Sequence, residues 1–132
     1  MKLLMFHVEE FWFRPNEYGE DESDGTTVEE AILVWIQSEA DDVQNRVAVL
    51  RKMVKNIRWL ASKLGTTRVI LHSFAHLGES KSTPDLAEHV IEETANRLRE
   101  RDFDVTIVPF GMFFEFKLHI KGPSIAKVFK QF

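Results

Sequence analysis

The side chains of this 132-residue chain that can move protons or bind metals are its five histidines and 21 carboxylates, because it contains no cysteine. His72 and His76 are four residues apart, which would place both on one face of a helix. His72 lies in an apolar run that predicts a strand, however, so helical metal-ligand geometry does not apply. No third ligand stands at a recognisable spacing. The sequence therefore predicts no metal site and singles out His76, which follows the strand end.

The pattern expected of a nucleophilic site is missing from the sequence. No serine stands in a Gly-x-Ser-x-Gly turn, and Ser73 has no convincing His–Asp pairing. No glycine-rich loop joins a strand to a helix, as phosphate-binding loops require. Several glutamates can supply a carboxylate pair, but exposed strand ends explain them equally well: Glu9, Glu10, Glu29, Glu30 and Glu115.

Residues 43–64 predict a helix with a basic face. They contain no acidic residue, and Arg51, Lys52, Lys55 and Arg58 recur away from the apolar stripe. The charge pattern of the whole chain is also uneven: residues 1–42 carry 12 acidic and 2 basic side chains, whereas residues 43–132 carry 15 basic and 9 acidic ones. A basic face can be simply solvated or can contact phosphates. From the residues alone, both interpretations stay open.

These side chains depend on a predicted mixed sheet for their positions. Apolar runs bounded by turn residues predict strands over residues 2–14, 29–39, 68–74, 105–110 and 112–121. The residues from 15 to 27, rich in acidic residues with Pro and Gly, predict a surface loop. The run from Ala31 to Ile36 is apolar throughout, as expected for a strand that is buried on both faces.

Helices are predicted between these strands. The first spans residues 43–64, with Asp41 or Asp42 as N-cap and Gly65 at its end. The second begins at Pro84 behind Thr83 and runs to about residue 101, and a short third follows Pro123 to about residue 129. The apolar stripe of the first helix comprises Val43, Val47, Leu50, Val54, Ile57, Ala61 and Leu64.

The expected order is ββαβαββα, an α/β (α+β) fold with helices packed on a mixed sheet, formed by residues 1–132 as one domain. Hydrophobic residues make up 44% and charged residues 29%, which is ordinary for a globular protein. The apolar run at residues 3–6 is too short for a signal peptide or a membrane span. The absence of cysteine fits a reducing cytoplasm.

Segments along the whole chain resemble the N-terminal editing domain of archaeal threonyl-tRNA synthetase, which has a D-aminoacyl-tRNA deacylase-like fold. Residues 4–7 look like its opening strand, which ends in a histidine, and residues 29–36 resemble its acidic pair followed by an apolar strand. Phe-Ala-His-Leu at 74–77 is similar to the signature after its third strand. Pro-Phe-Gly at 109–111, with the following aromatic strand and Lys-Gly-Pro at 121–123, resembles its last hairpin and helix.

The resemblance implies hydrolysis of serine misattached to threonine tRNA, in cis on a synthetase or in trans. Serine lacks only one methyl of threonine, a difference worth about 1–3 kcal/mol, so a second site must remove the error. In this family, backbone groups largely form the pocket. The 2′-hydroxyl of the terminal adenosine takes part in activating the water, and no cofactor is implied.

The resemblance also assigns the site residues. Gln37 and Ser38 should border the serine pocket. Its floor and wall should come from Phe74, Ala75 and His76, with His76 as a catalytic candidate. Phe113 stands where the family commonly has a tyrosine, so the ring is kept and the hydroxyl is lost.

Two positions depart from the family pattern. Phe114 replaces a lysine beside the substrate, and phenylalanine can neither donate a hydrogen bond nor hold a charge. Lys127 replaces a glutamate. Either backbone and RNA groups perform the chemistry, or the activity is lost. Strand alternation sets Lys117 opposite Phe114, which makes Lys127 the second catalytic candidate.

The partners implied are the acceptor end of tRNA(Thr), a second copy of the chain and a synthetase catalytic chain or domain, with no membrane. RNA contacts are then expected at Arg51, Lys52, Lys55 and Arg58. Phe11 and Phe13 are candidates for exposed aromatics at a dimer interface. The alternatives are a non-catalytic tRNA-binding or dimerisation module of the same fold, or a D-aminoacyl-tRNA deacylase, whose characteristic pocket motifs are not evident.

Overall fold

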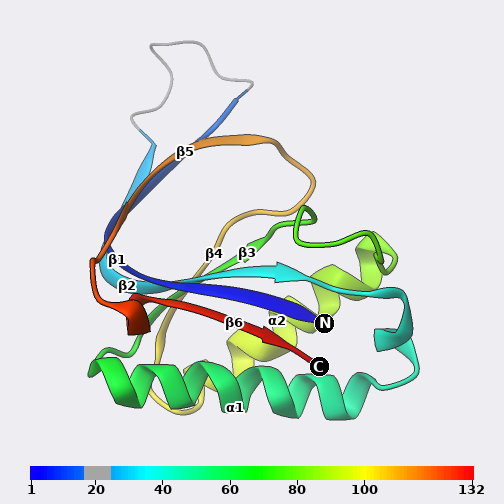
Figure 1. The fold of residues 1–132 in the computed structure, drawn as a ribbon. Helices are drawn as coiled ribbons and strands as arrows, with labels where there is room; N and C mark the ends of the chain where they lie inside the picture. The colour runs from blue at the N-terminus through cyan, green and yellow to red at the C-terminus, as the bar shows by residue number, and fades with distance from the viewer. Residues whose placement is uncertain (17–24) are drawn as a thin grey trace.

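A six-stranded mixed sheet with helices on one face forms the framework of the computed structural model, which describes residues 1–16 and 25–132 (Figure 1). The strands are β1 (Lys2–Pro15), β2 (Thr26–Gln37), β3 (Arg68–Ser73), β4 (Asp104–Ile107), β5 (Phe114–Ile120) and β6 (Lys127–Gln131). Their order is β4-β3-β2-β1-β5, and β6 pairs with β1 beside β5. This arrangement confirms the predicted mixed sheet.

The connections between the parallel strands determine where both long helices lie. β2, β3 and β4 are parallel neighbours, joined through α1 (Arg46–Leu64) and α2 (Pro84–Arg99). Two crossovers of the same hand in the same direction leave both helices on one face. As predicted, the hydroxyl of Thr83 accepts a hydrogen bond from the amide of Leu86 at the start of α2, and Gly65 ends α1 with a left-handed φ of 68°.

One strand, β1, organises the antiparallel part. Along one edge it pairs with β2, and its other edge is shared between β6 over its first half and β5 over its second. The register with β5 shifts between Val8 and Glu10, and Glu30 on β2 has a φ of 48°. Such irregularities bend a sheet, and Figure 1 shows β5 and the outer half of β1 curving away from α1.

The sheet separates two apolar clusters. The helix-facing cluster joins strands and helices through residues such as Leu3, Val34, Met53, Leu71 and Ile91. The cluster on the other face is richer in aromatics, and its buried members are Phe6, Val8, Phe11, Phe13, Ala31, Leu33, Ile70 and Val108. Phe11 and Phe13 are therefore core residues, and the expectation that they are exposed for dimerisation is wrong.

The start of α1 also differs from the prediction. Residues 40–43 form a short 3₁₀ helix, η1 (Ala40–Val43), and α1 begins only at Arg46, so Asp41 and Asp42 do not cap it. Val43 and Val47 are 61% and 76% exposed, and the buried stripe begins at Val49. The carboxylate of Asp42 instead accepts hydrogen bonds from the ammonium group of Met1 and, at the start of η1, from the amide of Glu39.

The predicted C-terminal helix is wrong. After the 3₁₀ turn η2 (Ser124–Ala126), the chain forms strand β6. Lys2 to Phe6 on β1 would otherwise present an unpaired edge, and pairing with β6 satisfies those backbone groups. The predicted loop is shorter than expected, because β2 already begins at Thr26. The rest of that loop, residues 17–24, lies outside the described residues.

Candidate active site

Two adjoining cavities lie where β2 and β3 end, at the carboxyl edge of the parallel strands. The larger, of about 470 Å³, is bounded mainly by residues 108–114 between β4 and β5. The smaller, of about 190 Å³, is bounded mainly by the end of β2 and the start of α2. They share four lining residues: Ser73, Ala75, Pro84 and Phe110. This edge is where ligands bind in open α/β sheets, so we take it as the candidate site.

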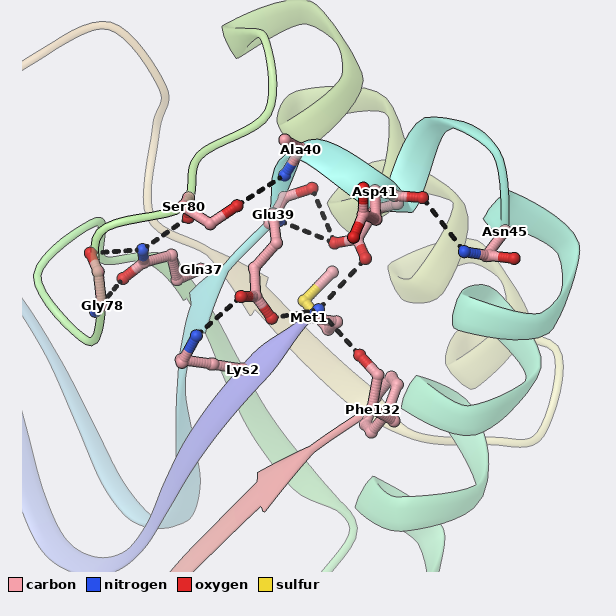
Figure 2. A network of polar contacts seen from close by, with 12 residues as sticks. Met1, Lys2, Gln37, Glu39, Ala40, Asp41, Asn45, Gly78, Ser80 and Phe132 are labelled. Atoms are coloured by element: carbon pink, nitrogen blue, oxygen red, sulfur yellow. Dashed lines mark hydrogen bonds and ion pairs between the residues drawn. The ribbon is translucent and has the colours of Figure 1, made fainter.

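Gln37 fixes the loop that follows β3. Its side-chain amide donates to the carbonyls of Gly78 (2.7 Å) and Ser80 (2.9 Å), and its side-chain oxygen accepts from the amides of Leu77 (2.6 Å) and Gly78 (2.9 Å). Figure 2 shows the side chain reaching into this loop. Gln37 is 1% exposed and its hydrogen-bonding groups are used by the protein. It therefore shapes the wall of the smaller cavity through the backbone.

A network of charges anchors the end of β2 beside this loop (Figure 2). The α-ammonium group of Met1 bonds to the carboxylates of Glu39 (2.6 Å) and Asp42 (3.0 Å) and to the carbonyl of Phe132 (2.8 Å). Asp42 also accepts from the Ser38 hydroxyl at 3.2 Å. Burial raises the pKa of Glu39, but hydrogen bonds from Lys2 and Met1 outweigh it, so the pKa falls below its usual value. Ser38 is thus held at the cavity edge.

His72 lines the larger cavity as a neutral side chain. Burial lowers the pKa of its imidazole to about 4. The indole nitrogen of Trp35 donates to Nδ1 of His72 at 3.2 Å. With Nδ1 as acceptor, the neutral ring carries its proton on Nε2, which makes that nitrogen a hydrogen-bond donor. The rings of Phe11, Phe74 and Phe116 pack around it.

Most of the predicted pocket residues come together at these cavities. Gln37, Ser38 and Ala75 line the smaller one, and Ala75, Phe113 and Phe114 line the larger. Phe113 is 82% exposed, whereas Phe114 is half-buried against Phe13, with ring centroids 5.6 Å apart.

The structure places three other candidates elsewhere. Phe74 stacks on Trp35 at 4.0 Å, and the exposed ring of His76 packs edge-on against Phe74 at 5.1 Å, beside the cavities and not among their lining residues. Lys127 pairs with Phe6 in the sheet, and its ammonium group donates to the carbonyls of Lys121 (2.8 Å) and Gly122 (3.0 Å). It therefore holds a turn and is not brought together with His76.

Sequence reasoning placed His72 in a strand and gave it no functional role, and it overlooked Lys81, which lines the smaller cavity. Lys81 is the one charged side chain among the described residues that line the two cavities, since His72 is neutral. A lysine shortly before a predicted N-cap at Thr83 was the available signal for a cation near the start of α2. The other polar groups that line the cavities are the Nε2–H of His72, serine hydroxyls and backbone amides.

The described residues that line the two cavities offer hydrogen-bond donors and an apolar wall, and no carboxylate is among them. Within the described residues, no group of three or more potential ligands could hold a metal ion. Nor is any helix there long and apolar enough to cross a membrane. Such a lining suits the binding of an uncharged polar group.

The fold defines the class of protein. The chain superposes on the structure of a probable eukaryotic D-amino acid tRNA deacylase with a TM-score of 0.66 at 9% identity, covering 98% of this chain and 97% of the other. The structure titled c-Myc DNA Unwinding Element Binding Protein gives a TM-score of 0.70 at 14% identity, covering 99% and 98%. At these identities the likeness shows a shared D-aminoacyl-tRNA deacylase-like fold.

The sequence then identifies the family. The model for the Archaea-specific editing domain of threonyl-tRNA synthetase matches residues 1–132, so the chain belongs to this family. Threonine–tRNA ligases of Thermococcus onnurineus and Thermococcus sibiricus share 32% and 29% sequence identity with the chain, in alignments that cover 97% of it. The chain spans 22% of the length of each. Family and fold together make the chain an aminoacyl-tRNA deacylase, a hydrolase.

Proposed function

We propose that this domain hydrolyses serine from mischarged threonine tRNA. The observation that carries the proposal is the pair of cavities at the ends of β2 and β3, which brings Gln37, Ser38, Ala75, Phe113 and Phe114 together in a member of the editing-domain family. The smaller cavity, of about 190 Å³, is a compact space between Gln37 and Ala75 that suits a small amino acid. Its serine hydroxyls and nearby backbone groups can bind the serine side chain.

Both the protein and the RNA supply groups that take part in the reaction. Water attacks the carbonyl carbon of the ester, the bond to the ribose oxygen breaks, and the products are free serine and tRNA with its terminal hydroxyl restored. The 2′-hydroxyl of the terminal adenosine assists the water, as the family resemblance implies, and the described lining residues include no carboxylate that would take this role. The Nε2–H of His72 donates to oxygen where negative charge develops. Phe114 contributes apolar packing in place of a charge.

In this proposal His76 stays a catalytic candidate at the rim, where its exposed ring can contact the terminal nucleotide. Lys127 acts at a distance by holding the turn at residues 121–123. The exposed cations of α1, Arg51, Lys52, Lys55 and Arg58, contact RNA. The domain works in the cytoplasm, where aminoacyl-tRNA is used, as a homodimer and with a threonyl-tRNA synthetase catalytic chain or domain. No cofactor is required.

The test is a deacylation assay with L-seryl-tRNA(Thr) and L-threonyl-tRNA(Thr), each compared with a control without protein. We expect rapid loss of serine and retention of threonine. Equal slow loss of both, matching the control, would overturn the proposal. A D-seryl-tRNA arm separates the remaining alternative, since preferential hydrolysis of the D-ester would assign the domain to D-aminoacyl-tRNA clearance.

A second candidate function is a tRNA-binding or dimerisation module without turnover. It is favoured by Phe114 and Lys127, which replace the family's lysine and glutamate, and by the engagement of Lys127 in a turn. Such a module would bind tRNA(Thr) with a strong salt dependence and leave both esters intact in the same assay.

A further inference from the structure

A groove between the two long helices collects positive charge. It has a volume of about 360 Å³ and receives five cations: Arg51, Lys55 and Arg58 from α1, Arg97 from the last turn of α2, and Arg101 from the turn just after α2. Its remaining lining residues are Val54 and one acidic residue, Glu100. Arg97 and Arg101 add a second wall to the basic face of α1, and the packing of α1 against α2 turns that face into a concave site.

These five cations lack the partners that most other cations of the domain have. Arg46 pairs with Glu93 at 3.0 Å and Arg68 with Asp104 at 3.3 Å, and Arg14 pairs with Glu115 at 2.5 Å. None of the five groove cations makes an ion pair or a side-chain hydrogen bond within the described residues. Glu100 makes no ion pair there either. The excess charge is therefore available to an external anion.

Helix electrostatics explain only part of this clustering. Cations near the C-terminal end of a helix are favoured by its dipole, which accounts for Arg97 and Arg101. Arg51, Lys55 and Arg58 lie within α1, where the dipole gives no such advantage. Their mutual repulsion across one groove disfavours the arrangement unless an anion spans it. A ligand with several phosphates relieves that repulsion along the full length of the groove.

We propose that this groove binds the sugar–phosphate backbone of the tRNA at a point separate from the terminal adenosine. The inference rests on the proposed function for the identity of the RNA. Pro84, at the cavities, and Arg97, in the groove, lie on the same helix, about 20 Å apart along its axis at about 1.5 Å per residue. That separation exceeds one nucleotide, so the groove contacts phosphates upstream of the nucleotide that enters the cavities.

The decisive variant is Arg97→Gln with Arg101→Gln, because sequence patterns single out neither residue. Its matched control removes two cations outside the groove, Lys117→Gln with Lys130→Gln, whose ammonium groups lie over Trp12 and Trp59. Binding of uncharged tRNA(Thr) to the 132-residue chain is measured by fluorescence anisotropy across a series of salt concentrations. Thermal unfolding of each variant confirms that it is folded.

We expect the groove variant to lose about tenfold in tRNA affinity at low salt, and the slope of log K against log salt to shrink by about 1 to 2. The control should keep both the affinity and the slope near the wild-type values. The loss should be larger for tRNA than for a CCA trinucleotide, which is too short to reach from cavity to groove. A groove variant that binds tRNA like the control would overturn the proposal.

Two further outcomes test which partner occupies the groove and whether groove binding and hydrolysis are independent. If poly-glutamate competes for the groove as well as RNA of similar charge, the groove belongs to an acidic protein partner and the RNA proposal is wrong. Because the tRNA is uncharged, its binding does not depend on hydrolysis. If the domain binds tRNA through the groove but leaves seryl-tRNA(Thr) intact, the proposed function is wrong and the groove proposal stands.

Discussion

Different interactions stabilise the two walls of the candidate site. The wall after β3 is held by polar bonds, four of them from the single side chain of Gln37 to the backbone of residues 77–80. The wall between β4 and β5 is apolar, and it ends in Phe113, which is 82% exposed. Hydrogen bonds fix a backbone in one geometry, whereas an exposed apolar loop tolerates substitution. The family differences at Phe113 and Phe114 fall on this tolerant wall, whereas the difference at Lys127 lies in β6, outside both walls.

The largest effect is expected from Gln37→Ala, which removes the polar wall's anchor. Four hydrogen bonds at about 1 kcal/mol each predict a loss of about 4 kcal/mol in the free energy of unfolding. Urea denaturation measures that loss, and hydrogen exchange at the amides of Leu77 and Gly78 shows whether the loop opens. The variant Gln37→Glu keeps the side-chain oxygen that accepts hydrogen bonds. Its free energy of unfolding should fall between those of the wild type and Gln37→Ala. Equal stability and protected amides in Gln37→Ala would contradict the contrast between the walls.

A second prediction concerns the acid sensitivity of His72, which lies between the walls. Its folded pKa of about 4 is below the unfolded value of about 6.5, so between these values the unfolded chain binds more protons. Stability is therefore complete above about pH 6.5 and falls as pH drops toward 4, by about 3 kcal/mol.

The check on His72 is to measure unfolding free energies at several pH values for the wild type and for His72→Phe. The substitution should remove this pH-dependent loss and slow deacylation, because the Nε2 donor is gone. His72→Gln should restore part of the rate, since its amide can donate. A Phe variant with unchanged pH dependence and unchanged rate would exclude both roles.

A third, smaller effect is expected from Asp42→Asn at the corner that supports Ser38. The substitution keeps the shape but removes the charge that faces the Met1 ammonium group at 3.0 Å. Glu39 still neutralises that ammonium group, which limits the expected loss to about 2 kcal/mol. Thermal and urea unfolding measure this loss in the free energy of unfolding. The control is the substitution Asp41→Asn at an exposed position. Matching curves for the two variants would show that the corner adds nothing.

The sequence predicted much of this fold because apolar runs and end signals are local. Thr83 and Pro84 at α2 and Gly65 after α1 fix their helix ends through nearby backbone geometry. The C-terminal prediction failed because residues 127–131 become a strand only through pairing with β1, which is distant in sequence. Asp42 was misassigned for the same reason, since its partner is Met1.

The site was predicted in part, and for comparable reasons. Gln37 and Ala75 were assigned through family resemblance. No local pattern distinguishes His72 from a core histidine, because its role depends on Trp35 in the neighbouring strand and on a cavity wall from residues 108–114. The groove shows the same limit. The cations of α1 are visible in the sequence, whereas Arg97 and Arg101 join them only through helix packing.

The smallest effect is expected on the apolar wall, from Phe113→Ala and from Phe114→Lys. Phe113 is largely exposed, so its truncation should change the free energy of unfolding by no more than about 0.5 kcal/mol. Phe114→Lys restores the family's lysine on a wall whose other lining residues offer no carboxylate to pair with it. If the chemistry rests on His72, backbone groups and the RNA, neither stability nor the rate of seryl-tRNA(Thr) hydrolysis should rise. A rate gain of tenfold or more in the deacylation assay, about 1.4 kcal/mol of transition-state stabilisation, would show that this wall limits catalysis and that the contrast between the walls is wrong.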